Sequence, residues 1–219
     1  MLVVSRSDLP SNRGIERAAQ DAIGALYKVY LCDVLDAVGP KLRKDVRSHL
    51  QEYFNPIAQG GGFPEGAFVD YITATPQPAA NELLIYFMPY GWSVANQMPN
   101  STSVNPLGGH DGLTKFSNTK DGQAVSEVYA KTTITRVVAN LAFHEAMHNK
   151  LRLGNEMHQQ KGAASKEIDD ATRPSEDNKK RMQAALKTDR PQWTGGVSLM
   201  LNKKRQQDSG DPAWNLTFP

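Results

Sequence analysis

Cysteine is almost absent from the 219 residues: the chain has one, Cys32, so an internal disulfide is excluded. Long apolar runs are also missing, since no stretch approaches the roughly 18 residues that a membrane-spanning helix needs. The start, Met1 to Arg6, lacks the basic segment and apolar run of a signal peptide. We therefore expect no membrane partner, and a protein that is cytoplasmic or exported without a cleaved signal peptide.

A charge excess of either sign is missing too. The 25 Lys and Arg residues are nearly balanced by 23 Asp and Glu residues, which leaves a formal net charge of +2. Short basic clusters such as Lys203-Lys204-Arg205 are typical of solvated surface. Because nucleic-acid binding depends on concentrated positive charge, we expect no nucleic-acid partner.

What the chain does have is helical periodicity on both sides of a middle part rich in glycine and proline. Apolar residues recur at every third or fourth position in the first 55 residues, which predicts helices over 13–37 and 40–54. Short strands are expected over 67–73, 82–89 and 124–129. Between the last two, residues 91–122 are polar without a clear period, and we expect a long loop there. Ser175 is placed to cap a further helix over 176–187.

The most regular helix is predicted over 132–153, with Gly154 as a left-handed cap at its end. It contains the motif His144-Glu145-Ala146-Met147-His148. Both histidines continue the apolar spacing of the helix, so we expect them on its buried face. Burying two imidazoles without partners is unfavourable, and a bound metal ion would remove that cost.

The spacing of the motif suits one metal ion. Residues four apart on a helix lie on the same side, about 6 Å apart along the axis, so both imidazoles can bind one zinc ion at about 2.0–2.1 Å. Glu145 is rotated by about 100° from His144, which puts its carboxylate beside the metal rather than on it. We therefore expect a zinc hydrolase, with Zn²⁺ as cofactor, His144 and His148 as metal ligands and Glu145 as the catalytic general base.

A catalytic zinc site needs a third protein ligand. His158 is the first candidate, because it follows His148 by ten residues and Gly154 can turn the chain back toward the metal. Other residues could take the same place, and these are Glu167, Asp169, Asp170 and His110.

This motif, followed by Gly154 and His158, resembles the zincin metallopeptidases and, more loosely, the metzincins. In metzincins a glycine ends the active-site helix and a third histidine follows it. Here both come later, by nearly one helical turn. The resemblance implies a zincin-like α+β fold with a small mixed sheet and a central zinc-binding active-site helix. It also implies a metalloendopeptidase acting on a peptide or protein substrate.

The resemblance implies three further features. A methionine turn beneath the metal would fall at Ser198-Leu199-Met200. An edge strand that pairs with extended substrate would fall at Leu83 to Met88, a segment that equally fits a central strand of the core. Since no tyrosine follows Tyr129, a phenolic group that stabilises the oxyanion would come from Tyr86 or Tyr90.

Together these observations predict one domain over 1–219, with a helical N-terminal part over 1–55 and a catalytic part over 56–219. Two other functions fit the same motif. One is a zincin-fold protein that binds zinc without turnover, such as a toxin-like effector. The other is an amidase acting on non-protein amide bonds.

Overall fold

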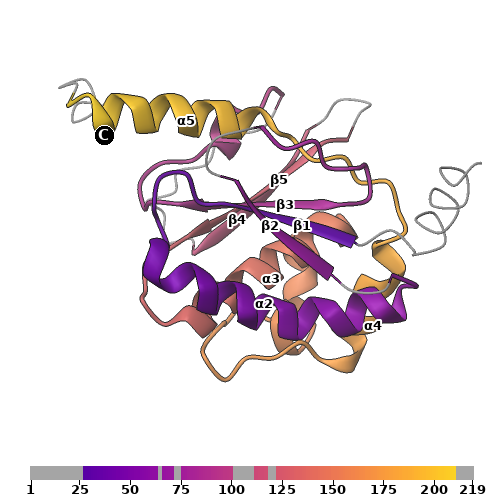
Figure 1. Ribbon diagram of the computed structural model, residues 1–219. Helices are drawn as coiled ribbons and strands as arrows, with labels where there is room; N and C mark the ends of the chain where they lie inside the picture. Colours follow the sequence, from indigo (N-terminus) through magenta and orange to yellow (C-terminus); the bar gives the residue numbers. More distant parts are fainter. Residues whose placement is uncertain (1–26, 64–65, 72–74, 101–110, 118–121, 211–219) are drawn as a thin grey trace, which may run out of the picture.

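The structure is a computed structural model, and it describes residues 27–63, 66–71, 75–100, 111–117 and 122–210. The described chain has an α+β fold in which helices cover both faces of one five-stranded mixed sheet (Figure 1). No helix in these ranges is both long enough and apolar enough to cross a membrane.

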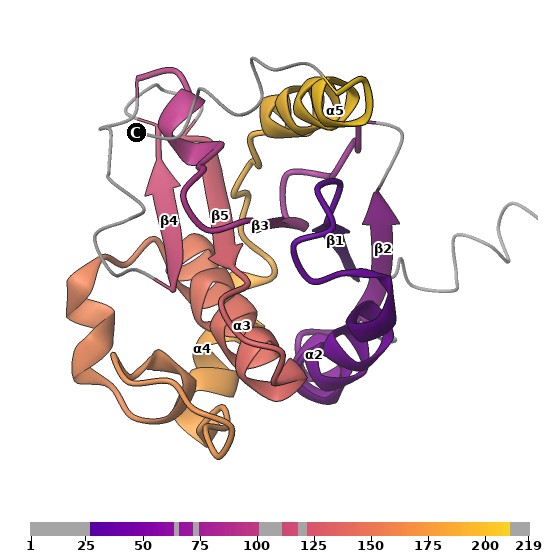
Figure 2. The same ribbon diagram turned by 90° about the vertical axis from the view of Figure 1, so that its left-hand side faces the viewer.

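The sheet has the strand order β2-β1-β3-β5-β4. The first four strands in this order run parallel. Strand β4 runs antiparallel to β5 at one edge (Figure 2). The strands are β1 (Tyr27–Cys32), β2 (Gly66–Tyr71), β3 (Leu83–Met88), β4 (Gly112–Phe116) and β5 (Ala124–Tyr129).

Helices α2, α3 and α4 lie on one face of the sheet and α5 lies on the other (Figures 1 and 2). Short 3-10 turns occur before β4 and after α3. The helices are α2 (Pro40–Gly60), α3 (Thr135–Leu151), α4 (Glu176–Ala185) and α5 (Gly195–Asp208), and the turns are η1 (Ala95–Gln97), η3 (Asn155–Gln159) and η4 (Gly162–Ala164). The predicted cap of α4 is confirmed, since Ser175 and Asn178 form a capping box.

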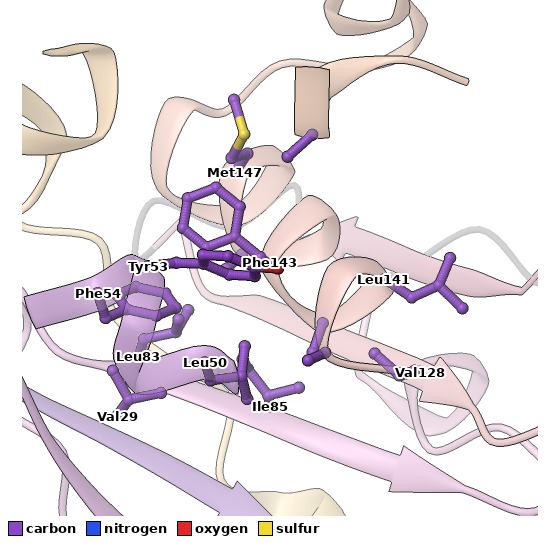
Figure 3. Close-up of a cluster of buried hydrophobic side chains, with 14 of the residues drawn as sticks. Val29, Leu50, Tyr53, Phe54, Leu83, Ile85, Val128, Leu141, Phe143 and Met147 are labelled. Carbon is purple, nitrogen blue, oxygen red and sulfur yellow. The ribbon is translucent and has the colours of Figure 1, made fainter. Parts of the chain in front are cut away.

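Alternate residues of the strands feed two separate cores. One core lies between the sheet and helices α2 and α3, where Phe143 packs edge-on against both Tyr53 and Phe54 (Figure 3). The other lies beneath α5 and includes Cys32, Tyr86 and Met200. The sheet therefore separates two cores, and the buried apolar side chains of α3 belong to the core on the side of α2 and α3.

The first predicted helix, over 13–37, is wrong where the structure describes it. Residues 27–32, predicted as helix, form β1, and residues 1–26 lie outside the described ranges. A parallel strand covered on both faces is apolar throughout, so its sequence resembles that of a buried helix. The second predicted helix is confirmed but continues past Pro56 to Gly60, because Ile57 and Ala58 are buried in the core.

Two other predictions also need correction. The long loop predicted over 91–122 contains the edge strand β4. The strand Leu83 to Met88 is confirmed as a strand, yet it lies in the middle of the sheet between β1 and β5, so it is not the edge.

Candidate metal centre

Helix α3 is buried on all sides, since every residue from Val138 to Lys150 is buried. Its faces have different neighbours. Phe143 packs against α2, His144 and His148 meet the segment that follows the helix, and Glu145 meets β4. Consecutive helical residues differ by about 100° in direction, so side chains within one turn of α3 contact three different parts of the structure.

The structure brings together the three histidines that the sequence singled out. The Nε2 atom of His148 lies 3.1 Å from Nε2 of His144 and 3.1 Å from Nε2 of His158, and the third side of this triangle is 3.2 Å. Four-coordinate zinc with Zn–N bonds of about 2.05 Å holds its nitrogens about 3.3 Å apart. The three nitrogens therefore have close to the separation that one metal ion requires.

Backbone carbonyls set the tautomers of two of these rings. Nδ1 of His144 lies 2.8 Å from the carbonyl oxygen of Ala163, and Nδ1 of His148 lies 2.7 Å from that of Leu153. Only a protonated Nδ1 can donate to these acceptors, so Nε2 carries the lone pair. Both lone pairs are thus directed into the triangle before any ion is bound.

The three imidazoles are also held neutral. The pKa of His144 is lowered to about 4, mainly by burial and also by the His148 and His158 rings, while the Ala163 carbonyl acts in the opposite direction. Burial likewise lowers the pKa of His148 and of His158. Since a metal ligand must be neutral imidazole, the group is ready to bind a cation at neutral pH.

A sharp turn after α3 brings His158 to the other two histidines. The left-handed residue is Arg152, with φ 54°, and Gly154 has φ −88°, so the predicted glycine cap is wrong. The guanidinium of Arg152 donates to the Gly122 carbonyl and lies over the Phe116 ring, contacts that offset the cost of a left-handed conformation. The turn η3 then carries His158.

The segment that supplies the Ala163 carbonyl is itself fixed to α3. Asn140, one turn before His144, donates to the carbonyl of Asp169 and accepts from the hydroxyl of Tyr53. This chain of hydrogen bonds joins α2, α3 and the segment after η4. The segment that contains the hydrogen-bond partner of His144 is therefore tied to α3 through Asn140.

The side chain of Glu145 reaches the edge strand β4. The hydroxyl of Thr114 lies 2.7 Å from Oε2 of Glu145 and 3.0 Å from its backbone carbonyl. Burial raises the pKa of Glu145 to about 8, the hydrogen bond from Thr114 lowers it, and Glu127 raises it. A carboxylate with such a pKa can exchange a proton near neutral pH.

The alternative third ligands are not part of this group. Glu167, Asp169 and Asp170 are exposed, and Asp169 accepts hydrogen bonds from Ala171 and Thr172 in its own turn. His110 lies outside the described residues.

Two other sequence predictions are wrong. Met200, predicted in a methionine turn, lies in helix α5 and contacts Cys32 on the opposite face of the sheet. Tyr86 donates to the Trp193 carbonyl on that same face, so it is unavailable to an oxyanion on the α3 side. Tyr90 packs against Tyr129 and Lys131 beyond the end of β3.

Sequence reasoning missed two residues of the edge strand. Thr114 is the hydroxyl partner of Glu145, and Gly112 leaves room for its side chain, because a Cβ there would lie 2.4 Å from Oε1 of Glu145. The segment from Leu113 to Phe116 has no alternation of apolar and polar residues, so no local pattern predicted this strand.

Comparison with known proteins adds no relative: no family model matches the chain, and no curated protein and no solved structure matches it.

Proposed function

We propose that this chain is a zinc-dependent hydrolase of the zincin type that cleaves peptide bonds. The observation that carries the proposal is the triangle of Nε2 atoms from His144, His148 and His158, with a buried carboxylate on the next residue of the same helix. Zinc held there supplies a Lewis acid that polarises a carbonyl and lowers the pKa of water toward neutrality.

The residues of the chain have separate tasks in this reaction. His144 and His148 present their lone pairs because backbone carbonyls hold their Nδ1 protons. Glu145 takes the proton of the attacking water and passes it to the leaving amine. Its Oε2 accepts a hydrogen bond from Thr114, which fixes the orientation of this carboxylate.

The position of strand β4 is an argument for a peptide as the substrate. Among the described strands it pairs only with β5, and its Thr114 side chain touches Glu145. The free edge of a sheet binds an extended peptide through backbone hydrogen bonds, and this is the arrangement that the zincin resemblance implies beside the active-site helix. The edge strand for this role is β4 rather than Leu83 to Met88.

Metal content and turnover, measured together, test the proposal. We expect purified protein to hold one zinc ion per chain and to cleave a fluorescence-quenched peptide library. Glu145→Gln should keep its zinc and lose roughly 100-fold or more in kcat, because the general base is gone. His158→Ala should weaken zinc affinity, which is measured by competition with a chromophoric chelator.

Glu167→Ala is the matched control, since this acidic residue was the rival ligand and is exposed. It should leave zinc affinity and turnover unchanged. Protein that binds no zinc, with His144→Ala making no difference, would refute the proposal. Zinc binding with cleavage of non-protein amides but not of peptides would favour the amidase, and zinc binding without any turnover would favour a zinc-binding effector.

A further inference from the structure

Thr114 occupies the middle of the edge strand, opposite Ser126 of β5. Its side chain points toward α3, where its hydroxyl lies 2.7 Å from Oε2 of Glu145 and 3.0 Å from the Ser126 hydroxyl. The Ser126 hydroxyl lies 3.3 Å from the Glu145 carbonyl. A small group of hydroxyls thus fills the space between the sheet and the helix beside Glu145.

Buried amides behind these hydroxyls determine which way the protons point. Asn149 donates through Nδ2 to the Ser126 hydroxyl at 2.9 Å and to Oε1 of Gln192 at 3.0 Å. Gln192 donates back to Asn149 and to the Arg190 carbonyl. Because both protons of each amide are used within this network, Ser126 is an acceptor from Asn149 and its own proton points toward Thr114 or the Glu145 carbonyl.

The hydroxyl proton of Thr114 is then directed to the carboxylate. Of its contacts, the one to Oε2 of Glu145 is the shortest. Asn149, Ser126 and Thr114 thus form a line of hydrogen-bonded side chains that ends on Glu145. Gly112 completes the arrangement, because its missing side chain lets the carboxylate lie against β4.

We propose that Thr114 is a positioning residue that, through Oε2, holds the Glu145 carboxylate against strand β4 and so fixes the orientation of the base. This inference rests on the proposed function, since it assigns Glu145 the role of base. A base that is held in one orientation does not spend time in unproductive conformations, so the reaction is not slowed by them. The strand that would bind the substrate and the group that would carry the proton are thereby joined by one hydrogen bond.

Thr114→Val keeps the branched shape of the side chain and removes the hydroxyl, whereas Thr114→Ser keeps the hydroxyl. We expect Thr114→Val to lower kcat by roughly 10- to 100-fold with KM changed little, and Thr114→Ser to restore most of kcat. In a Glu145→Gln background, Thr114→Val should cause no further loss. Zinc content should be the same in all variants. A full kcat in Thr114→Val, or a loss that Thr114→Ser fails to restore, would overturn the inference.

An infrared measurement tests the contact without turnover. The difference spectrum between wild type and Glu145→Gln isolates the carboxyl band of Glu145, in both metal-free and zinc-loaded protein. Thr114→Val should shift that band and Thr114→Ser should return it, whereas Thr133→Val, at an exposed threonine, should leave it unchanged. An unshifted band in Thr114→Val overturns the inference. If wild type cleaves no peptide, the proposed function fails, and this band still decides whether Thr114 holds Glu145.

Discussion

Glu145 is a carboxyl group placed where water hardly reaches it, with 4% of its surface exposed. Burial raises its pKa to about 8, Thr114 opposes this rise and Glu127 adds to it. In the metal-free chain, Glu145 therefore keeps its proton over a pH range in which the unfolded chain has already ionised it. A cation at the histidines would lower this pKa, because it stabilises the charged form.

The stability contributed by protonated Glu145 is complete below the unfolded pKa of 4.5 and is lost as pH rises through about 8. Glu145→Gln removes this titration. As pH rises from about 5 to about 9, we expect the unfolding free energy of the metal-free variant to increase by a few kcal/mol relative to that of wild type, measured by urea unfolding. Glu167→Gln, at an exposed position, is the control. A constant difference between wild type and Glu145→Gln over this range would contradict the expectation.

At the level of elements, strand β4 and helix α3 are closely packed at Gly112. An added Cβ would lie 2.4 Å from Oε1, 2.7 Å from Cγ and 2.8 Å from Cδ of Glu145. The carboxylate cannot simply swing away, because it is buried and bonded to Thr114. Gly112→Ala should therefore displace either the carboxylate or the strand.

We expect Gly112→Ala to destabilise the protein by about 1–3 kcal/mol in urea unfolding and to reduce turnover while zinc stays bound. The matched background is Glu145→Ala, in which the added methyl group meets no carboxylate. There the cost of Gly112→Ala should nearly vanish. An equal cost in both backgrounds would mean that the strand backbone, rather than Glu145, is what the methyl group disturbs.

The elements also show how far the sequence could be interpreted. Helix α3 and its histidines were predictable, because helical period and ligand chemistry coincide within one short segment. Strand β1 was not, since it is buried on both faces and shows no alternation. Helix α5 was missed because its buried residues, Val197 and Met200, are too few to establish a period. The pairing of Thr114 with Glu145 joins residues 31 apart, and no local pattern encodes it.

On the scale of the whole molecule, the sheet divides the protein into a side with the histidines, Glu145 and Thr114 and a side with α5. Protonation couples the first side to global stability in two opposing ways. His144, with its pKa lowered to about 4, favours folding above pH 6.5 and loses that contribution as pH falls through 4. Glu145 gains stability over part of the same fall in pH.

Removing Glu145 should therefore expose the effect of the histidines. We expect metal-free Glu145→Gln protein to lose roughly 2 kcal/mol or more between about pH 7 and about pH 5, and wild type to lose less. Urea unfolding of chelator-treated protein measures both. Adding His144→Asn to Glu145→Gln should reduce this loss of unfolding free energy at acid pH. A loss that is unchanged by His144→Asn would be assigned to other groups.

The three histidines lie within 15 consecutive residues, from His144 to His158. In polymer terms, an ion bound there cross-links a very short loop, so closing that loop costs little entropy even when the rest of the chain is unfolded. The denatured chain should then retain measurable zinc affinity, and binding to the denatured state subtracts from the stabilisation of the native one. We expect excess zinc to raise the unfolding free energy by less than the affinity of the folded protein alone would give.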